Sequence, residues 1–533
     1  MTALATRSLA TRLSDIVETS VATPGVVAFP KSTVELQATL GVLREANQSF
    51  LVTATAHNWG YTAGTERVGD SNSVTISLQN MCRIRTYDAD LGTVTIEPGV
   101  TQGALAQFLA EKGDRFFVDT TSAGESVSIV GNICDRGFGN SALGNRATHV
   151  LSVELLLADG SLVQSDSTSL FTNQTHTHAE NVATPFAPGP GLVGLAIQSN
   201  LAIVTAMQIT LNRRAEYECA LGFELTDTKR LPEFIEAIRD LKQLGHLPGC
   251  LHVANDLRII SNLTRLPRTT PPDLRPLTSL ERSQLRSEHG TASWTGFTLL
   301  GGTRDSVKAE LAAIRQRVGA LARTRTLTPN KIYSLRRTLE RICTRWPRIL
   351  NIKPIARLRN KLERGKILLD TLRGKPSNEL LYNTGWRCLD LENRAPTPQE
   401  LDAGSNVGIL WYAPAVALKR DAVRRVMEVA EPIFERHGFD MLTMFTFVTD
   451  RHGVVVFNIL FDARHEKARA RACYQELLAR GRVEGFFPYR LPAFAWEEMA
   501  GQAKPTALSS LHARLKKALD PSGLIAPGRY GIG

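Results

Sequence analysis

Short runs rich in β-branched residues alternate with amphipathic segments between Pro30 and Val204. Ser32–Ala46 has its apolar residues at helical spacing, whereas Phe50–Thr55 and Thr93–Glu97 are typical of strands. The alternation predicts an α+β domain in this part of the chain. Further elements predicted here are a strand at Ser73–Ser77, a helix at Gln102–Lys112, a hairpin of Val150–Leu157 with Ser161–Gln164, and a β-rich run at Gln198–Leu211. The hairpin prediction depends on Asp159-Gly160, which favours a two-residue turn.

A second α+β unit is predicted from Ala215 to about Arg482. Its expected elements are amphipathic helices at Leu231–Leu244 and Asp421–His437 and a strand pair within Met444–Phe461. The last stretch contains a helix at Ser509–Leu519, which Asp520-Pro521-Ser522-Gly523 brings to an end. A length of 533 residues also favours more than one hydrophobic core.

The net charge of +11 comes largely from Arg315–Arg373, where Arg and Lys interleave with Leu and Ile. This pattern predicts a solvated face of one or two amphipathic helices, with a docking surface for an acidic partner as the alternative. No nucleic-acid-binding motif accompanies it, so we expect no nucleic-acid partner. The seven cysteines include no CxxC pair and predict neither a zinc site nor a disulfide framework.

The chain has no run of about 18 uncharged apolar residues, which is what a membrane-spanning helix needs. Met1–Val17 carries Arg7, Arg12 and Asp15 among small polar residues and does not resemble a secretory leader. These features predict a soluble, cytoplasmic protein without a membrane partner.

Two loops rich in small residues are candidates for holding a cofactor. Thr53–Tyr61 follows a predicted strand, and its backbone NH groups could cradle a diphosphate. Ser122–Asn132 leads to Asp135–Gly139, where glycines allow the backbone to approach a flat ring system. From these residues alone, ordinary tight turns are an equal alternative.

Six motifs in order and spacing resemble the vanillyl-alcohol oxidase and p-cresol methylhydroxylase family of FAD enzymes. They are AHNWGY at Ala56–Tyr61, IEPGVTQGAL at Ile96–Leu105, VGNICDRGFGN at Val130–Asn140, GLAIQSNLAIVT at Gly194–Thr205, PYR at Pro488–Arg490 and DPSGLIAPGRYG at Asp520–Gly531. The resemblance extends from about Pro30 to Gly533 and is weakest between Arg213 and Pro376.

The resemblance implies a bipartite FAD-binding domain of two α+β subdomains and an α+β cap domain with an antiparallel sheet. The implied boundaries are 1–213 for the FAD-binding domain, 214–482 for the cap with its basic insertion at about 315–373, and 483–533 for a C-terminal segment that returns to the FAD site. The cap would supply the far wall of the active site.

For a substrate phenolate, the resemblance implies a site at Tyr61, Tyr489 and Arg490. A guanidinium flanked by two tyrosine hydroxyls supplies charge-assisted donors in a fixed geometry, which is what a phenolate needs. Trp411 matches an aromatic residue that lines the substrate pocket, with core packing as the alternative. His452 lies close to the position of an active-site histidine in the family.

The resemblance also implies FAD contacts along both loops and the tail. The implied cofactor-binding residues are Thr55, Ala56, His57, Asn58, Trp59, Gly60, Gly99, Ser122, Gly131, Asn132, Asp135, Gly137, Asn200, Val204 and Arg529. If FAD is held covalently, His57 is the expected attachment point, because it occupies the loop position used in berberine-bridge-like relatives. Tyr382 matches the usual downstream attachment stretch poorly, and non-covalent FAD is the alternative.

The resulting expectation is an FAD-dependent oxidase or dehydrogenase that removes a hydride from the benzylic carbon of a para-substituted phenol by way of a quinone methide. Oxidative decarboxylation of a tyrosine-derived substrate is a variant of the same chemistry. The alternatives are an alcohol or 2-hydroxyacid oxidase and a basic binding protein with an inactive flavin fold. Expected partners are a small phenolic substrate, oxygen or a redox protein as electron acceptor, and a second copy of the chain in a homo-oligomer.

Overall fold

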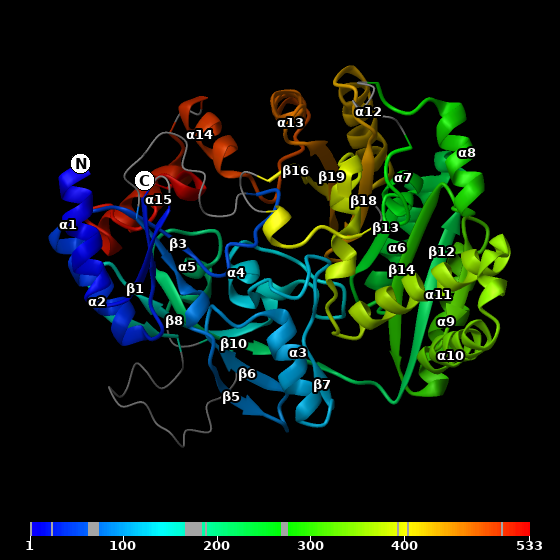
Figure 1. Cartoon of the computed structure of the whole chain (residues 1–533), viewed down its shortest axis with the longest axis horizontal. Helices are drawn as coiled ribbons and strands as arrows, with labels where there is room; N and C mark the ends of the chain where they lie inside the picture. The colour runs from blue at the N-terminus through cyan, green and yellow to red at the C-terminus, as the bar shows by residue number, and fades with distance from the viewer. Residues whose placement is uncertain are drawn as a thin grey trace.

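The computed structural model describes residues 3–22, 25–61, 74–165, 184–186, 189–267, 275–391, 394–401, 405–502 and 505–532. Figure 1 shows two lobes: elements from both ends of the chain lie together in one, and the green-to-orange residues between them form the other around the largest sheet. Helices and mainly antiparallel sheets occur in both lobes, which confirms the predicted α+β class.

The first sheet has the strand order β1-β2-β4-β3 and is partly parallel. Helix α2 begins after Ser32, whose side chain accepts a hydrogen bond from the Glu35 amide at 3.2 Å, and it buries Leu36, Leu40 and Leu43 in the core of this subdomain. The helix and strands predicted here are confirmed, although Ser73 lies outside the described residues. The elements are α1 (Ala3–Ser14), β1 (Glu18–Ala22), β2 (Gly25–Phe29), α2 (Thr33–Glu45), β3 (Phe50–Thr53) and β4 (Val74–Ser77).

The second sheet is antiparallel, in the order β5-β6-β10-β8-β9. The predicted hairpin of β8 with β9 is confirmed, but the two-residue turn is wrong. Leu157 N donates to Ser161 O at 2.9 Å, so the loop has three residues, and Gly160 adopts φ 91°, which glycine tolerates without strain. The elements are β5 (Ile84–Asp88), β6 (Thr93–Ile96), α3 (Gln102–Glu111), α4 (Ile129–Cys134), β8 (Val150–Leu156), β9 (Leu162–Gln164), α5 (Val193–Ala196) and β10 (Ile203–Thr210).

A short pair of strands, β7 (Phe116–Phe117) and β11 (Asn212–Arg213), precedes the crossing into the second lobe. That lobe contains an antiparallel sheet in the order β15-β12-β14-β13-β18-β19-β16, with β17 also paired to β19. Its strands are β12 (Tyr217–Leu225), β13 (Leu251–Asn255), β14 (Trp294–Gly302), β15 (Arg323–Leu327), β16 (Val407–Tyr412), β17 (Ala415–Ala417), β18 (Leu442–Phe447) and β19 (His452–Asp462). The predicted strand pair and helices of this unit are confirmed.

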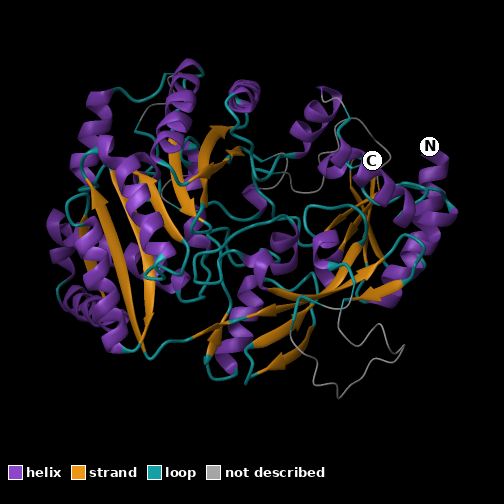
Figure 2. Cartoon of the chain, turned by 180° about the vertical axis from the view of Figure 1, so that it is seen from behind, coloured by secondary structure: helices purple, strands orange, loops and turns teal. Residues whose placement is uncertain are grey.

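The two faces of this large sheet have different neighbours (Figure 2). On β13, Leu251 and Val253 lie in the core that the sheet forms with its covering helices. The intervening His252 points to the other face, where its ring stacks against Phe138 of the first lobe at 6.4 Å between centroids. The free face of the sheet is therefore turned toward the first lobe. The helices of this lobe outside the basic segment, on either face of the sheet, are α6 (Leu231–Gln243), α7 (Asp256–Ile260), α8 (Ser279–His289), α9 (Arg304–Val318), α12 (Arg420–Arg436) and α13 (Lys467–Val483).

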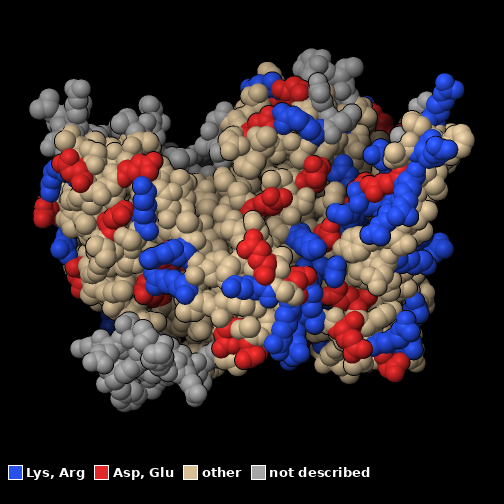
Figure 3. Space-filling model, turned by 60° about the horizontal axis from the view of Figure 1, so that its bottom comes forward, with Lys and Arg blue, Asp and Glu red and all other residues tan. Residues whose placement is uncertain are grey.

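The basic segment forms β15 and two neighbouring helices, α10 (Pro329–Arg345) and α11 (Lys353–Leu372). Ile332 and Cys343 are buried while Arg337 and Arg341 are exposed, as an amphipathic pattern predicts. Figure 3 shows Lys and Arg side chains over the side of the molecule where Figure 1 places these helices. The prediction of a surface segment is wrong at its C-terminal end, because Thr371 is buried and its carbonyl accepts a hydrogen bond from Thr120 at 2.7 Å.

The C-terminal stretch contains α14 (Ala493–Gln502) and α15 (Ala507–Leu519) and then returns to the first sheet. Phe50 N donates to Leu524 O at 2.9 Å, and Ala526 N donates to Phe50 O at 2.7 Å. Across the described residues, no helix combines the length and apolar character needed to cross a membrane. Short 3-10 helices occur at Leu78–Asn80, Arg146–His149, Thr228–Arg230, Pro347–Asn351, Asn378–Gly385, Leu389–Leu391, Gln399–Leu401 and Arg529–Gly531.

Candidate active site

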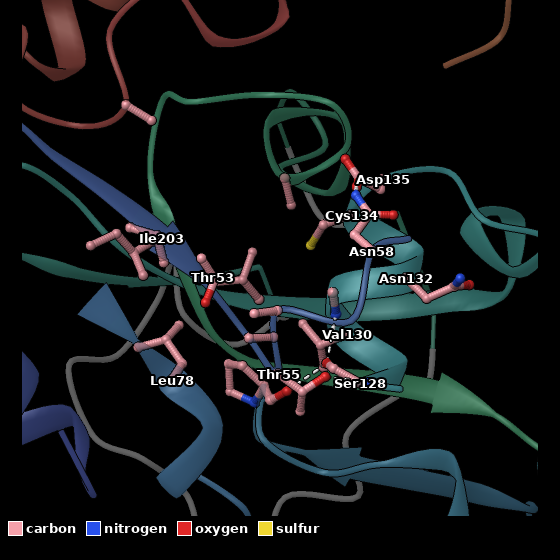
Figure 4. A pocket seen from close by; sticks show the side chains of 18 of the residues that line it. Thr53, Thr55, Asn58, Leu78, Ser128, Val130, Asn132, Cys134, Asp135 and Ile203 are labelled. Carbon is pink, nitrogen blue, oxygen red and sulfur yellow. Dashed lines mark hydrogen bonds between the residues drawn. The ribbon is translucent and has the colours of Figure 1, made fainter. Parts of the chain in front are cut away.

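A cavity with about 1030 Å³ of empty space, part of it open to solvent, is lined by both predicted loops, β10 and the C-terminal tail. Figure 4 shows Leu78 and Ile203 at one end and Asn58 and Asp135 at the other, with Thr55 and its neighbours between them. A space that is apolar at one end and polar at the other suits a ligand with dissimilar ends.

The first loop follows β3 and is held to the second by side-chain and backbone contacts. Thr55 Oγ1 accepts a hydrogen bond from Ser128 N at 3.2 Å, and His57 Nδ1 lies 3.2 Å from the Ser126 carbonyl. Ala56 has φ 59°, a left-handed conformation that lets the backbone turn sharply along the cavity. The small and polar residues Thr53–Asn58, at the end of β3, thus form one wall of the site.

The second loop enters α4, which Ser128 caps by accepting a hydrogen bond from Gly131 N at 2.9 Å. A Cβ placed on Gly131 would lie 3.1 Å from the Cβ of Ala54, so the absence of a side chain allows the two loops to approach. Gly99 has a different role, since a Cβ there would lie 2.3 Å from the Gln79 carbonyl oxygen.

Many of the predicted cofactor residues are brought together here. Those that line the cavity are Thr55, Ala56, His57, Asn58, Gly131, Asn132, Asp135, Asn200, Val204 and Arg529. Predicted residues that do not line it are Trp59, Gly60, Gly99, Ser122 and Gly137. Thr53, Ala54, Val127, Ser128 and Val130 also line the cavity and lie in the two predicted loops, although they were not named as cofactor contacts. Lining residues outside those loops that were not named are Val52, Leu78, Pro98, Cys134, Ala196, Ser199, Ala202, Ile203, Ile525, Ala526 and Tyr530.

The cavity fits FAD in its chemistry. Asn200 is buried in the wall, and its Nδ2 donates to the carbonyls of Ala526 at 2.9 Å and Ile532 at 2.7 Å. Its Oδ1 has no partner among the described residues, which leaves an acceptor for a ligand N–H group. Arg529 brings a cation to the polar end.

Asp135 collects donors from three separate parts of the chain at this polar end. Arg490 Nη2 donates to its Oδ2 at 3.1 Å, and Asn58 and the Tyr530 hydroxyl also donate to the carboxylate. Burial by itself would raise the pKa of Asp135, but the charges of Arg490 and Arg529 outweigh it and the pKa is lowered. Asp135 is therefore an anion that fixes both arginines.

Tyr61, Tyr489 and Arg490 lie together next to this carboxylate. The Arg490 guanidinium is 4.1 Å from the Tyr61 ring centroid and 6.0 Å from that of Tyr489, and its Nη2 also donates to Asn58 Oδ1 at 2.6 Å. Burial and the neighbouring Tyr489 raise the pKa of Tyr61 well above its usual value, so Tyr61 remains a neutral hydroxyl. Burial opposes the charge of Arg490, but Asp135 outweighs it and raises the pKa of the guanidinium.

Trp411 and His452 differ in their contacts with the site. The Trp411 indole donates to the Trp59 carbonyl at 2.7 Å, and a Cβ on Gly60 would lie 2.0 Å from it, so this side chain packs directly on the first loop. His452 lies at the start of β19 with Nδ1 3.0 Å from Thr449 Oγ1, and the structure gives it no contact with the tyrosine–arginine cluster among the described residues.

His252 is the histidine that the fold brings toward the site, and sequence reasoning missed it. Its ring stacks on Phe138, whose ring in turn lies 5.4 Å from that of Tyr489. Burial, joined by the charge of Arg258, lowers the pKa of His252 to about 4. Strand alternation predicts which residues share a face, but not which face meets another lobe.

The two candidate attachment points for FAD are separated by the fold. His57 lines the cavity, and its ring stacks on Trp59 at 5.2 Å. Tyr382 is buried between the guanidinium groups of Arg265 at 4.0 Å and Arg364 at 4.9 Å and is not among the described residues that line the cavity.

Comparison with known proteins gives the same assignment of the cofactor. Residues 24–166 match the family model described as an FAD binding domain. The chain is 29% identical over 512 residues to 1'-carboxy-chondrochloren decarboxylase of Chondromyces crocatus, covering 95% of this chain and 90% of that protein. It is 23% identical over 521 residues to the flavoprotein subunit of 4-cresol dehydrogenase (hydroxylating) of Pseudomonas putida, covering 97% and 89%.

Solved structures share the fold over the whole chain. The 4-ethylphenol oxidase of Gulosibacter chungangensis, in its isoeugenol complex, superposes with a TM-score of 0.83 at 20% identity, covering 100% of this chain and 98% of that one. p-Cresol methylhydroxylase with substrate bound gives a TM-score of 0.82 at 20% identity with the same coverage. At this identity, the likeness shows the fold alone.

Proposed function

We propose that this FAD-dependent oxidoreductase belongs to the vanillyl-alcohol oxidase and p-cresol methylhydroxylase family and oxidises the benzylic carbon of a para-substituted phenol. The observation that carries the proposal is the cluster of the buried Arg490 and Tyr61 with the half-buried Tyr489 beside the FAD cavity. A guanidinium and two tyrosine hydroxyls can bind one phenolate oxygen.

The charge of the cluster supports an anionic ligand. Asp135 is one carboxylate facing both Arg490 and Arg529, so the three groups together carry one net positive charge. A phenolate would neutralise that charge without competing for Asp135. Tyr61 and Tyr489 would donate hydrogen bonds to the same oxygen.

The chemistry follows from holding the substrate as a phenolate. FAD, when bound, accepts two electrons and one hydrogen as a hydride. Electron density from the para oxygen helps the benzylic C–H bond break, and the substrate becomes a quinone methide. Water can then add to the benzylic carbon, or a proton can be lost to give an alkene. Trp411 and Phe138 would help to keep bulk water from this space.

Oxidative decarboxylation is the second candidate, because the relative at 29% identity is named a decarboxylase. A quinone methide that carries a carboxylate on the next carbon can lose it as CO2, and the electron pair of the broken C–C bond restores the phenolate. A tyrosine-derived substrate would meet this requirement.

Anaerobic rapid-mixing experiments test the proposal directly. The holoenzyme is mixed with para-alkylphenols, para-hydroxybenzyl alcohols and N-acyl tyrosines, and bleaching of the flavin absorbance is followed. We expect at least one phenolic class to reduce the flavin, whereas lactate and simple sugars do not. Reduction by the 2-hydroxyacid or alcohol alone would favour the alternative oxidase, and a protein unable to take up FAD would favour the inactive binding protein.

The acceptor and the cellular setting belong to the same proposal. We expect oxygen or a redox protein to reoxidise the flavin in a cytoplasmic, homo-oligomeric enzyme. Oxygen consumption during turnover distinguishes the two acceptors, and sedimentation velocity gives the oligomeric state.

We further propose that any covalent link to FAD runs through His57, since this ring lines the cavity and Tyr382 does not. Mass spectrometry of peptides from the denatured holoenzyme checks this, with a mass increase expected on the peptide that contains His57. A flavinylated Tyr382 peptide would contradict the assignment, and quantitative release of FAD by acid would show non-covalent binding.

A further inference from the structure

Arg258 is a partly buried cation whose side chain has no partner among the described residues. It lies in α7, directly after β13, and its side chain makes no hydrogen bond, ion pair or ring contact with the described residues. Its Nε is enclosed. The main-chain groups of Arg258, by contrast, are all used, because N donates to Asn255 Oδ1 at 2.9 Å and O accepts from Ser261 and Asn262.

Three of the four arginines that are buried among the described residues have carboxylate partners, while Arg265 donates to the main-chain carbonyls of Tyr382 and Arg394. Arg146 pairs with Asp119 at 2.8 Å, Arg387 with Glu466 at 2.7 Å, and Arg490 with Asp135 at 3.1 Å. A buried guanidinium without such a partner is energetically costly. An arginine kept in that state is suited to an anion that arrives with a ligand.

The surroundings of Arg258 place it on the substrate side of the large sheet. Burial lowers its pKa to about 10, and the residue keeps intermediate exposure, so part of its side chain is accessible to a ligand. Its charge also reaches His252, whose ring stacks on Phe138. Phe138 in turn contacts Tyr489, so a series of rings leads from Arg258 toward the phenolate cluster.

A second unpartnered polar group faces the same side of the sheet. Asn458 is 1% exposed, and neither Oδ1 nor Nδ2 has a partner among the described residues. Asn458 belongs to β19, where it lies opposite Trp411 of β16 on one side and opposite Leu442 of β18 on the other. Leu442 belongs to the same buried cluster as Leu257, the neighbour of Arg258.

We propose that Arg258 binds a carboxylate of the substrate, so that the enzyme acts on para-hydroxyphenyl compounds whose side chain carries a carboxylate. The inference rests on the proposed phenol oxidation and adds a second anion site to it. Arg490 with its two tyrosines would hold the phenolate end, Arg258 would hold the carboxylate end, and Asn458 would offer hydrogen bonds between them. The ligand carboxylate would supply the negative charge that no described residue provides for Arg258.

Matched substrate pairs that differ only by a carboxylate test the proposal. N-Acetyltyrosine is compared with N-acetyltyramine, and 3-(4-hydroxyphenyl)propanoate with 4-ethylphenol. Kd is measured by calorimetry on holoenzyme that has been reduced with dithionite, because the reduced enzyme cannot oxidise the ligand. Flavin reduction is measured separately on the oxidised enzyme. We expect at least one carboxylated member to bind more tightly than its neutral partner, and Arg258→Met to weaken it by about a hundredfold.

Two variants show that the effect belongs to the charge at this position. Arg258→Lys should restore part of the preference, and Arg359→Met, which removes an exposed arginine from α11, should leave it unchanged. Neutral phenols should bind the Arg258→Met enzyme as they bind the parent. An unchanged preference in a folded, FAD-loaded Arg258→Met enzyme, or no preference in the parent for either pair, would overturn the inference.

The outcome also separates this inference from the proposed function. If the neutral phenols reduce the flavin but no carboxylate is preferred, phenol oxidation stands and the anion site does not. If no phenol reduces the flavin, the proposed function fails, while the calorimetric comparison still decides whether Arg258 binds a carboxylate.

Discussion

At the scale of single residues, the guanidinium of Arg490 has two tasks. It donates to Asp135 and Asn58, which tie it to the FAD-binding lobe, and it lies over the Tyr61 ring, where a phenolate is proposed to bind. Because Asp135 also receives donors from Tyr530 and faces Arg529, Arg490 is not the only group that compensates this carboxylate. Removing Arg490 should therefore affect the substrate more than the cofactor.

We expect Arg490→Met to slow flavin reduction by a phenol by roughly a hundredfold, or about 3 kcal/mol, because a desolvated charge-assisted contact is lost. FAD binding should change much less. Tyr489→Phe and Tyr61→Phe remove one donor each and should be milder, with effects that do not add because all three groups act on one oxygen.

The measurement is the anaerobic reduction rate of variants that are folded and fully loaded with flavin. Arg490→Lys serves as the matched control, since it keeps the charge but not the planar fork, and should recover part of the rate. Reduction of the Arg490→Met enzyme at the parent rate by every phenol tested would place the phenolate site elsewhere.

His252 makes stability depend on pH at the same site. Its pKa is lowered from 6.5 to about 4, chiefly by burial, so the folded protein keeps a neutral ring while the unfolded chain takes up a proton below pH 6.5. The stability contribution is present above pH 6.5 and is lost as the pH falls toward 4. The slope should approach 1.4 kcal/mol per pH unit, or about 2 kcal/mol between pH 6.5 and 5.

Urea unfolding followed between pH 7.5 and 5 checks this expectation. His252→Phe keeps an aromatic ring between Phe138 and Phe297 and should flatten the dependence, whatever it does to stability at pH 7.5. Replacing the exposed His465 with Gln should leave the parent slope intact. The same slope in His252→Phe as in the parent would show that another group is responsible.

At the scale of elements, α10 and α11 are joined by ion pairs as well as by packing. Arg336 bonds to Glu340 and Glu363 on the two helices, so it belongs to the structure of the pair. Arg337, Arg341 and Arg345 are exposed on α10 instead. These three residues test whether the basic surface has any part in turnover.

We expect the triple change of Arg337, Arg341 and Arg345 to Glu to leave turnover of a small phenol unchanged, because none of them approaches the FAD cavity. Association with an acidic partner or an anion-exchange surface should change instead, and more so at low salt. Arg336→Glu is the contrasting variant and should lower the unfolding temperature, because it breaks pairs with both helices. A collapse of turnover in the triple variant with flavin intact would contradict this prediction.

The elements were predictable from the sequence to the extent that one local pattern determines each of them. Alternation and helical spacing place α2, α3, β8 and β18 within a few residues. The turn of the β8–β9 hairpin was missed because Asp-Gly occurs in both two- and three-residue loops. The burial of Thr371 was missed because a helix pattern does not reveal which end of the helix meets another lobe.

The residues of the candidate site were also predictable from the sequence only in part. Loop residues such as Asn58 and Asp135 were named because they lie in motifs that resemble the family, and both line the cavity. Wall residues such as Leu78 and Ile203 have the pattern of any buried strand or turn. Tyr530 was missed although Arg529 precedes it, and His252 is brought toward the site only through the register of the large sheet.

At the scale of the whole molecule, residues from the two ends of the chain line the same cavity. Ile525, Ala526, Arg529 and Tyr530 line the same space as the Thr53–Asn58 loop. The tail is held by Lys516, whose ammonium donates to the Asn200 and Ile525 carbonyls, both at 2.7 Å, and pairs with Asp520 at 2.7 Å. Asp520 in turn accepts hydrogen bonds from the amides of Leu524 and Ile525.

We expect Lys516→Met to weaken FAD binding and to destabilise the protein, because it leaves the buried Asp520 carboxylate and two carbonyls without their cation. Removing one partner of a buried pair costs about 3–5 kcal/mol. The free energy lost should appear in urea unfolding of the FAD-free protein, and the loosened tail should raise the Kd for FAD measured by flavin fluorescence. Lys517→Met is the matched control, since this neighbour is exposed and donates only to the Pro521 carbonyl at 3.0 Å. If Lys516→Met bound FAD and unfolded as Lys517→Met does, the closure of the cavity would not depend on this lysine, and the other contacts of the tail, such as those with Phe50, Asn200 and Asp135, would be enough to hold it.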